Sequence, residues 1–343
     1  MEFTMNSTLH EILNNERVNK KLHYLFSPAY YENIRPILRK MKLKHMVKFA
    51  KTPWGRPFPA EGLLRCANLL ISRREAGELI SIPIWKDLPE EQAEEAENVV
   101  LIPFLLKDKK DAPCVILCPG GGYTRVACHN EGIPVAEELN RRGYQAFLLN
   151  YRVYPSLYPA PEQDLVRAIR FVRANREKLG VDPENVMIMG FSAGGHLCAC
   201  VGALYDHIED PTHRYDHISA RPDKICLSYP VISFMEDCHE GSLIHHLGEN
   251  ATEEKKKTLS AEMLTSRDYP PTFLWACQDD DVVPVSNTER MAASLKNKKA
   301  PYEMKLYPEG GHGLGLAEGT GAQGWLDEME SFFTSIRRLP KTI

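Results

Sequence analysis

A serine between two glycines, in the run Gly190-Phe-Ser192-Ala-Gly194, is the stretch of this sequence best suited to nucleophilic chemistry. The apolar residues 186–189 before it predict a buried strand, and the residues after it predict a helix. Glycines are needed on both sides of such a turn because a side chain there would collide with the neighbouring strand or helix. The turn lifts the serine hydroxyl above the sheet edge and aims the helix N-terminus at a developing negative charge. We therefore expect Ser192 to be a nucleophile.

A serine hydroxyl needs a base to take its proton. The strand–turn–helix pattern at Ser192 therefore predicts an acid and a histidine later in the chain, in that order. His312 lies between glycines after a strand predicted over residues 302–307, and this flexible loop can carry its imidazole over the sheet. Asp279, Asp280 and Asp281 follow the strand predicted over residues 272–277. Asp280 stands in an Asp-x-x-Val-Pro spacing that is common in enzymes with such a serine turn. This likeness favours Asp280 as the acid, with Asp279 as the main alternative and Asp281 not excluded.

The oxyanion formed during attack on a carbonyl must also be stabilised, and a glycine run can supply the donors. Gly120, Gly121 and Gly122 follow a short apolar strand predicted over residues 114–118. Two of their N–H groups, together with that of Ala193, would form the oxyanion hole. One alternative is a phosphate-binding loop, but the Gly-Lys-Ser/Thr that such a loop requires does not follow these glycines. The other alternative is a purely structural turn.

The elements that carry these residues alternate between strands and helices. Continuous apolar strands separated by helices indicate a parallel sheet covered on both faces, which places functional residues at the carboxyl ends of the strands. An antiparallel pair, residues 79–85 and 98–106 joined by an acidic turn, is expected before it. The remaining strands and helices are predicted over residues 145–151 (strand), 163–179 (helix), 193–204 (helix), 224–229 (strand), 288–298 (helix) and 324–336 (helix).

Two regions depart from this alternation. Residues 1–78 show helical spacing in three places, 9–13, 31–41 and 63–71, and are expected to form a helical extension before a catalytic domain of residues 79–343. We interpret the basic residues of this region as lying on a solvent-exposed helix face. Residues 205–268 are expected to be inserted loops that overhang the site and select the substrate.

The composition excludes several classes of partner. The chain has 343 residues, 43% of them hydrophobic, and a formal net charge of −4, so we expect no nucleic acid partner. Nine cysteines without a Cys-x-x-Cys pair suit reduced thiols in the cytoplasm. No secretory signal is recognised, and the apolar runs are too short to cross a membrane. A soluble cytoplasmic protein is expected; its oligomeric state, including a homo-oligomer, is left open.

Seven segments together resemble the α/β-hydrolase esterases grouped with acetyl xylan esterases and feruloyl-esterase-like hydrolases. The resemblance covers about residues 79–337 and implies an α/β-hydrolase fold, carboxylic ester hydrolysis, no metal or cofactor, and a small ester substrate such as an acetylated sugar or xylan fragment. Gln278 departs from the pattern, and residues 1–78 lie outside it. The segments begin at Pro119, Glu131, Asn150, Gly190, Pro270, Val283 and Gly311.

Two other functions are compatible with the same motifs. A serine peptidase of the prolyl-oligopeptidase type has the same order of catalytic residues, but such enzymes usually carry a cap larger than 78 residues. A catalytically inactive α/β-hydrolase fold could serve as a binding module, but such proteins typically lose the serine or the histidine. Both residues are present here, so an esterase that acts through an acyl-enzyme on Ser192 is the leading hypothesis.

Overall fold

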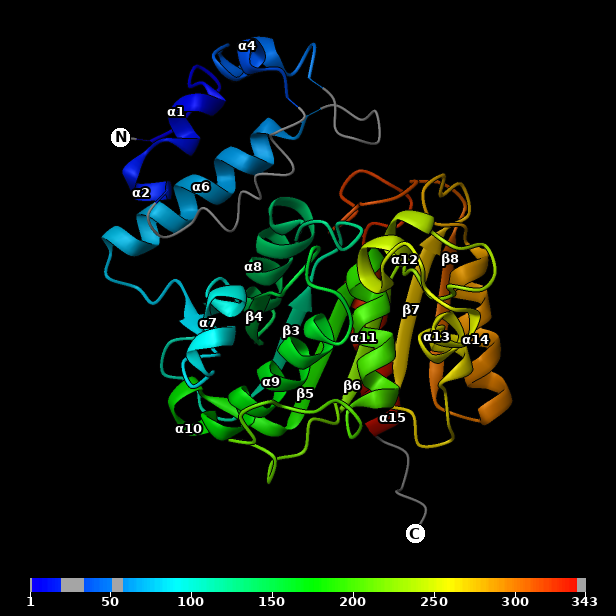
Figure 1. Ribbon diagram of the computed structural model, residues 1–343. Coiled ribbons are helices and arrows are strands. Elements are labelled where there is room, and N and C mark those ends of the chain that lie inside the picture. Colours follow the sequence, from blue (N-terminus) through cyan, green and yellow to red (C-terminus); the bar gives the residue numbers. More distant parts are fainter. Residues whose placement is uncertain (1, 20–33, 51–57, 338–343) are drawn as a thin grey trace. The chain divides into compact units, whose positions relative to one another are not determined.

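A computed structural model describes residues 2–19, 34–50 and 58–337 of the chain. The chain divides into two compact units, Met1–Ile82 and Pro83–Ile343. The first unit consists of helices, and the second is built on a sheet of eight strands (Figure 1).

The first unit contains five described helices. The helices expected near residues 9–13 and 63–71 are confirmed, whereas the one expected over 31–41 lies partly outside the described residues and otherwise reduces to α4, which begins at a proline. The side chain of Asn68 accepts from the Phe3 amide and donates to its carbonyl, which ties the N-terminal segment to α6. The helices are α1 (Leu9–Leu13), α2 (Glu16–Asn19), α4 (Pro36–Arg39), α5 (Leu43–Met46) and α6 (Ala60–Glu75).

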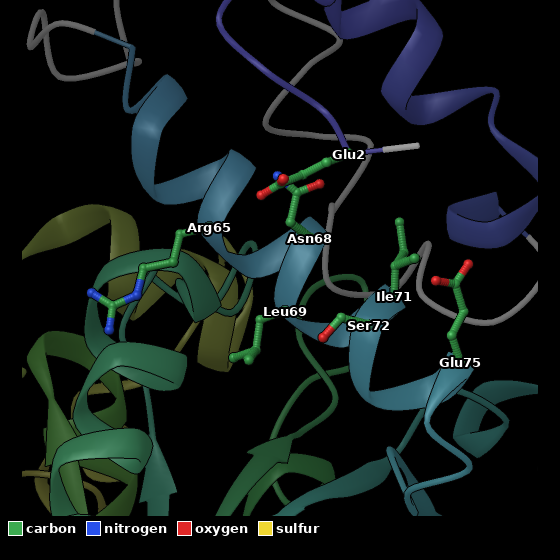
Figure 2. A pocket seen from close by; sticks show the side chains of 7 residues that line it. All are labelled: Glu2, Arg65, Asn68, Leu69, Ile71, Ser72 and Glu75. Atoms are coloured by element: carbon green, nitrogen blue, oxygen red, sulfur yellow. The ribbon is translucent and has the colours of Figure 1, made fainter.

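One side of α6 lines a pocket of about 520 Å³, and none of the residues predicted for catalysis lies in it (Figure 2). Its polar groups come from one arginine, two glutamates, an asparagine and a serine. The lining residues are Glu2, Arg65, Asn68, Leu69, Ile71, Ser72 and Glu75.

The sheet of the second unit has the strand order β1-β2-β4-β3-β5-β6-β7-β8. β2 runs antiparallel to β4, and the pairs from β4 to β8 are parallel, so the predicted mostly parallel sheet is confirmed. Four of the central strands, β3 to β5 and β7, are almost entirely buried because their side chains are apolar on both faces. The strands are β1 (Ile82–Pro83), β2 (Val100–Phe104), β3 (Ala112–Cys118), β4 (Gln145–Asn150), β5 (Val181–Phe191), β6 (Lys224–Ser228), β7 (Thr272–Cys277) and β8 (Tyr302–Tyr307).

The acidic stretch before β2 corrects one expectation. It was expected to be a turn, but it contains the helix α7 (Glu90–Ala96), which begins directly after Pro89. Glutamate, glutamine and alanine are good helix formers, and a proline is tolerated at the start of a helix. The strand expected over residues 79–85 is also shorter than expected, because only β1 pairs in the sheet.

Helices cover both faces of the sheet. α9 (Ala160–Ala174) and α11 (Ser192–Leu204) pack against each other in front of β5, and α15 (Trp325–Arg337) lies behind the sheet (Figure 1). α8 (Ile133–Arg141), which was not expected, is linked to α15 because Arg142 pairs with two of its carboxylates. The helix expected over residues 163–179 is divided into α9 and α10 (Arg176–Leu179).

The segment of residues 205–268 surrounds β6 with short helices. These are α12 (Glu240–Leu247), α13 (Glu253–Thr258) and the 3₁₀ turn η3 (Ala261–Met263). α14 (Ser286–Lys298) then connects β7 to β8. Among the described helices, none combines the length and the apolar character needed to cross a bilayer.

The parallel strands determine where the predicted site residues lie. β3, β5, β6, β7 and β8 all run in the same direction, so the loops after their carboxyl ends meet at one edge of the sheet. The glycine loop follows β3, Ser192 follows β5, the aspartates follow β7, and His312 follows β8.

Candidate active site

Ser192 occupies a strained backbone position between β5 and α11. Its φ angle is +52°, in the left-handed region that residues with a Cβ rarely adopt. A Cβ at Gly190 would lie 2.2 Å from the carbonyl oxygen of Gly194, and a Cβ at Gly194 would lie 2.0 Å from that of Cys118. The turn therefore requires glycine at both flanking positions, as the motif predicts.

His312 connects Ser192 to an acid. Its Nε2 atom lies 2.8 Å from Ser192 Oγ, and its Nδ1 atom lies 2.7 Å from Asp280 Oδ2. The other oxygen of Asp280 accepts the amide hydrogens of Val282 and Val283, both at 2.9 Å. Because the carboxylate only accepts, the neutral imidazole carries its proton on Nδ1 and presents the lone pair of Nε2 to the serine.

The neighbouring aspartates have different contacts. The carboxylate of Asp279 accepts the amide hydrogens of Gly310 at 3.1 Å and Gly311 at 2.8 Å, and so holds the start of the loop that carries His312. Asp281 is exposed. Of the three candidate acids, Asp280 is the one that lies against the imidazole.

The glycine loop after β3 lies against the serine. A Cβ at Gly120 would come within 2.7 Å of Ser192 Cβ. The amide of Gly120 donates to Glu131 Oε2 at 2.7 Å, so it is already engaged. Within the described part of the chain, no protein acceptor is bonded to the amides of Gly121, Gly122 or Ala193. These three are the predicted donors that remain for an oxyanion.

The inserted segment reaches the site through two histidines. His239 Nδ1 accepts the amide hydrogen of Ser242, and its Cε1 atom would lie 3.8 Å from a Cβ at Gly122. Burial, together with the nearby His312 and His245, lowers the pKa of His239. His245 Nδ1 donates to the carbonyl of Gly122 at 3.1 Å. The segment thus borders the glycine loop directly.

Two further residues at the site were given no chemical role from the sequence, although Glu131 begins one of the segments that carry the resemblance. Glu131, in the π-helical turn η2 (Cys128–Gly132), accepts from the Gly120 amide and from the hydroxyl of Tyr229, which follows β6. Burial raises the pKa of Glu131, opposed by His312 and by the Gly120 hydrogen bond. Tyr229 lies 98 positions along the chain from Glu131, so no local motif could have paired them.

This arrangement is suited to transfer of an acyl group by a serine. The imidazole can take the proton from Ser192, and Asp280 can stabilise the resulting imidazolium. The amides of the glycine loop and of the start of α11 are the candidate donors to the oxyanion. In the residues that the structure describes, no cluster of three or more His, Cys, Asp or Glu side chains could hold a metal ion.

Comparisons with known proteins give the family. The BD-FAE family model matches residues 103–295, which is more than half of the chain. The chain belongs to the BD-FAE family. The resemblance to acetyl xylan and feruloyl-esterase-like α/β-hydrolases is thereby confirmed. The BD-FAE match takes in the glycine loop, Ser192 and Asp280, and it ends before His312.

A solved structure supports both the family and the fold. The chain is 42% identical to the acetyl ester-xyloside bifunctional hydrolase from Caldicellulosiruptor lactoaceticus, with a TM-score of 0.68 over 75% of this chain and 96% of that one. At 22% identity and a TM-score of 0.64, a truncated carbohydrate esterase from gut microbiota has the same fold. The expected α/β-hydrolase fold is confirmed.

Two curated relatives of this BD-FAE member are longer proteins. Endo-1,4-beta-xylanase B from Butyrivibrio fibrisolvens is 38% identical over 66% of this chain and 36% of its own length. Acetylxylan esterase from Xylanibacter ruminicola is 29% identical over 62% of this chain and 43% of its own length. The chain therefore spans about two fifths of the length of these relatives.

Proposed function

We propose that the chain is a serine carboxylic ester hydrolase that removes acetyl groups from carbohydrates resembling xylo-oligosaccharides. The observation that carries the proposal is the continuous hydrogen-bonded path from Ser192 Oγ through His312 to Asp280. The names of the relatives, an acetylxylan esterase and an acetyl ester-xyloside hydrolase, support acetyl esters of xylose-containing sugars as the substrate class.

The proposed reaction has two steps. In the first, His312 Nε2 takes the Ser192 proton as Oγ attacks the ester carbonyl, while Asp280 holds the imidazole in the tautomer that can accept it. His312 then gives the proton to the leaving sugar hydroxyl, which leaves an acetyl group on Ser192. In the second step, water attacks this acyl-enzyme with His312 again as the base, and acetate is released.

The oxyanion of each tetrahedral intermediate would be stabilised by the amides of Gly121, Gly122 and Ala193. Gly120 belongs to the same loop, but we assign it a role in shaping the loop because its amide is bonded to Glu131. Hydrogen bonds aimed at a developing oxyanion are worth about 10²–10³ in kcat for each donor.

The remaining expectations are part of the proposal. All nine cysteines are free thiols, which supports a reducing compartment such as the cytoplasm. We assign residues 79–343 to the catalytic domain and residues 1–78 to a helical extension. A small ester is the proposed partner, and neither a nucleic acid nor a cofactor is part of the mechanism.

A substrate panel tests the proposal. Initial rates on acetyl, butyryl and feruloyl esters of one chromogenic alcohol, on acetylated xylo-oligosaccharides and on a proline arylamide should be greatest for the acetyl esters. Ser192→Ala should abolish this hydrolysis, whereas the exposed Ser219→Ala should retain the wild-type rate. Preferential cleavage of the arylamide would support the peptidase alternative, and undiminished hydrolysis by Ser192→Ala would rule out the serine mechanism.

A further inference from the structure

Glu131 connects two loops of the site that are distant in sequence. It is 3% exposed and lies in η2, in contact with the glycine loop. Its Oε2 accepts the Gly120 amide hydrogen at 2.7 Å, and its Oε1 accepts the hydroxyl hydrogen of Tyr229 at 3.0 Å. The Tyr229 oxygen in turn accepts the amide hydrogen of Gly315 at 3.0 Å, three residues after His312. One side chain thus joins the oxyanion loop to the loop of the base.

The same π-helical turn also holds the histidine loop directly. Asn130 Nδ2 donates to the carbonyl of Gly313 at 3.1 Å. A Cβ at Gly315 would lie 2.3 Å from the carbonyl oxygen of Asn130, so the two backbones are in close contact there. π-Helical turns are rare and occur frequently at functional sites. The turn therefore contacts both the glycine loop and the loop that carries His312.

The directions of these hydrogen bonds require an acceptor at position 131. The Gly120 amide can only donate, and the Tyr229 hydroxyl donates its hydrogen to Glu131 while its oxygen accepts the Gly315 amide hydrogen. A carboxylate satisfies both donors. A carboxamide of the same shape would turn an N–H toward one of them, which leaves a buried group unpaired.

Tyr229 also contacts the base through its ring. The centroids of the Tyr229 and His312 rings are 4.7 Å apart, with the planes inclined at 63°. Tyr229 is 1% exposed, and its φ angle is +37°, a conformation that the surrounding contacts must maintain. A shift of this phenol would therefore move both the amide of Gly315 and the imidazole.

We propose that Glu131 is a positioning residue, which uses its two carboxylate oxygens to hold the oxyanion loop and the His312 loop at the spacing that the transition state requires. The inference rests on the proposed serine mechanism. Glu131 does not touch the reacting atoms, so its removal should affect the transition state far more than the binding of the substrate.

Three variants test this. Glu131→Gln keeps the shape and removes the second acceptor, Tyr229→Phe removes only the hydroxyl and keeps the ring against His312, and the double variant tests whether the two act through one another. Asp210→Asn is the matched control, because its carboxylate is equally buried and pairs with Arg167 instead of with the site. The readouts are kcat and KM on a chromogenic acetyl ester, inhibition by a trifluoromethyl ketone that forms a tetrahedral adduct on serine, and thermal unfolding.

We expect Glu131→Gln to lower kcat by about 10- to 100-fold, somewhat less than the loss of an oxyanion donor, with KM within about twofold of wild type. The inhibition constant of the ketone should rise by a similar factor. The double variant should be no more than about twofold slower than Glu131→Gln, because coupled residues are not additive. Asp210→Asn should lower the unfolding temperature and leave kcat unchanged.

A kcat within about twofold of wild type for folded Glu131→Gln, or a loss confined to KM, would overturn the inference. If Glu131→Gln does not fold, the test is made with Tyr229→Phe. In that variant, kcat and ketone inhibition equal to those of the wild type would overturn the inference. Labelling of Ser192 by a fluorophosphonate needs no substrate. If the wild type is labelled rapidly but hydrolyses no ester, the proposed function fails, and slower labelling of Glu131→Gln would still support the positioning role.

Discussion

Asp280 Oδ2 lies 2.7 Å from His312 Nδ1, whereas the carboxylate of Asp279, one residue earlier, accepts the amides of Gly310 and Gly311. Two adjacent carboxylates therefore act on the same loop in different ways. One orients the imidazole, and the other holds the backbone that leads to it.

Substitution of the two aspartates should separate these roles. Asp280→Asn should lower kcat by about 10³- to 10⁴-fold, because the amide can donate to Nδ1 and favour the wrong tautomer of His312. Asp279→Asn keeps one acceptor for the Gly310 and Gly311 amides and should lower kcat by less than about tenfold. Steady-state kinetics on an acetyl ester measure both. Equal losses in the two variants would contradict the assignment of Asp280.

The glycine loop should tolerate an added methyl group at Gly122 but not at Gly121. At Gly121, where φ is +133°, a Cβ would lie 2.2 Å from the carbonyl oxygen of Arg125. At Gly122, where φ is +62°, the nearest atom is His239 Cε1 at 3.8 Å. Gly122→Ala should cost about 1 kcal/mol of stability and Gly121→Ala more than about 2 kcal/mol, because a clash adds to the backbone strain. Urea unfolding checks this order, and the reverse order would refute the loop geometry.

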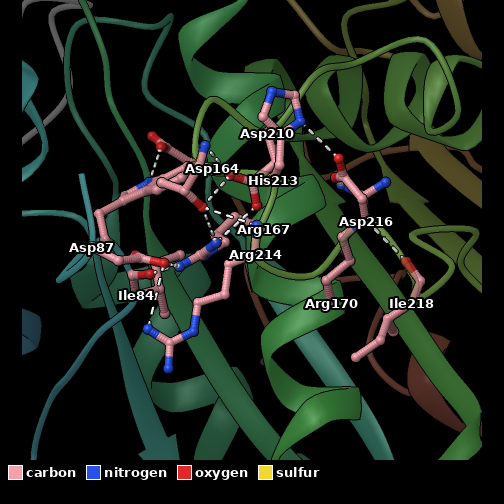
Figure 3. Close-up of polar contacts among 12 residues, drawn as sticks. Ile84, Asp87, Asp164, Arg167, Arg170, Asp210, His213, Arg214, Asp216 and Ile218 are labelled. Atoms are coloured by element: carbon pink, nitrogen blue, oxygen red, sulfur yellow. Dashed lines mark hydrogen bonds and ion pairs between the residues drawn. The ribbon is translucent and has the colours of Figure 1, made fainter. Parts of the chain in front are cut away.

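Arg167 should be essential for stability and not for catalysis. It is 1% exposed and bonds to Asp87, to Asp210 at 2.8 Å and to the carbonyl of Ile84 at 3.0 Å (Figure 3). Arg167→Met leaves the fully buried carboxylate of Asp210 without its cation, whereas Asp87 keeps Arg214 nearby, and should cost about 3–5 kcal/mol in the free energy of unfolding.

The neighbouring Arg170 is the control for this prediction. It pairs with Asp216, whose side chain is 45% exposed, so Arg170→Met should remove an ion pair worth about 0–1 kcal/mol. Chemical denaturation and kcat are measured for both variants. A larger loss of stability in Arg170→Met than in Arg167→Met, or a lower kcat in folded Arg167→Met, would contradict the claim that Arg167 contributes to stability and not to catalysis.

Because of the buried His196, the free energy of unfolding should decrease as the pH falls from 7 to 5. Its Nε2 donates to the carbonyl of Leu259 at 2.7 Å, so its Nδ1 accepts the Tyr123 hydroxyl hydrogen at 2.9 Å. Burial, with His246 nearby, lowers the pKa of His196 to about 3. Below the unfolded pKa of about 6.5 the unfolded chain binds a proton that the folded protein excludes, so stability falls by roughly 1 kcal/mol per pH unit.

Denaturant unfolding between pH 7 and pH 5 measures this slope. His129, whose pKa burial lowers to about 4, should add a similar contribution. His196→Gln cannot take up a proton and should show a shallower dependence on pH than the wild type. Parallel curves for the two proteins would show that His196 does not contribute in this way.

The sequence predicted the parts of the site that depend on local patterns. β3 and β7 are short apolar runs, and β8 is a short strand that alternates with polar residues and pairs in parallel with β7. The residues after these parallel strands therefore had to meet at one edge of the sheet. The local spacing favoured Asp280 but left Asp279 open, because the choice depends on which carboxylate the loop turns toward His312.

Other features depend on tertiary contacts. The link from Glu131 to Tyr229 joins residues 98 positions apart and has no local signature. The acidic stretch before β2 was predicted as a turn, although the glutamate, glutamine and alanine residues of α7 favour a helix. α8 was not predicted, although Pro134 stands in its first turn, where proline is favoured.

Trapping of the acyl-enzyme tests the central claim most directly. The protein is mixed with an acetyl ester, quenched in acid within the first turnover and digested, and the peptides are analysed by mass spectrometry. We expect one acetyl group on the peptide that contains Ser192, and none after the same treatment of Ser192→Ala. Rapid hydrolysis of the ester by Ser192→Ala, or an acetyl group that accumulates on another residue of the wild type at the rate of turnover, would contradict it.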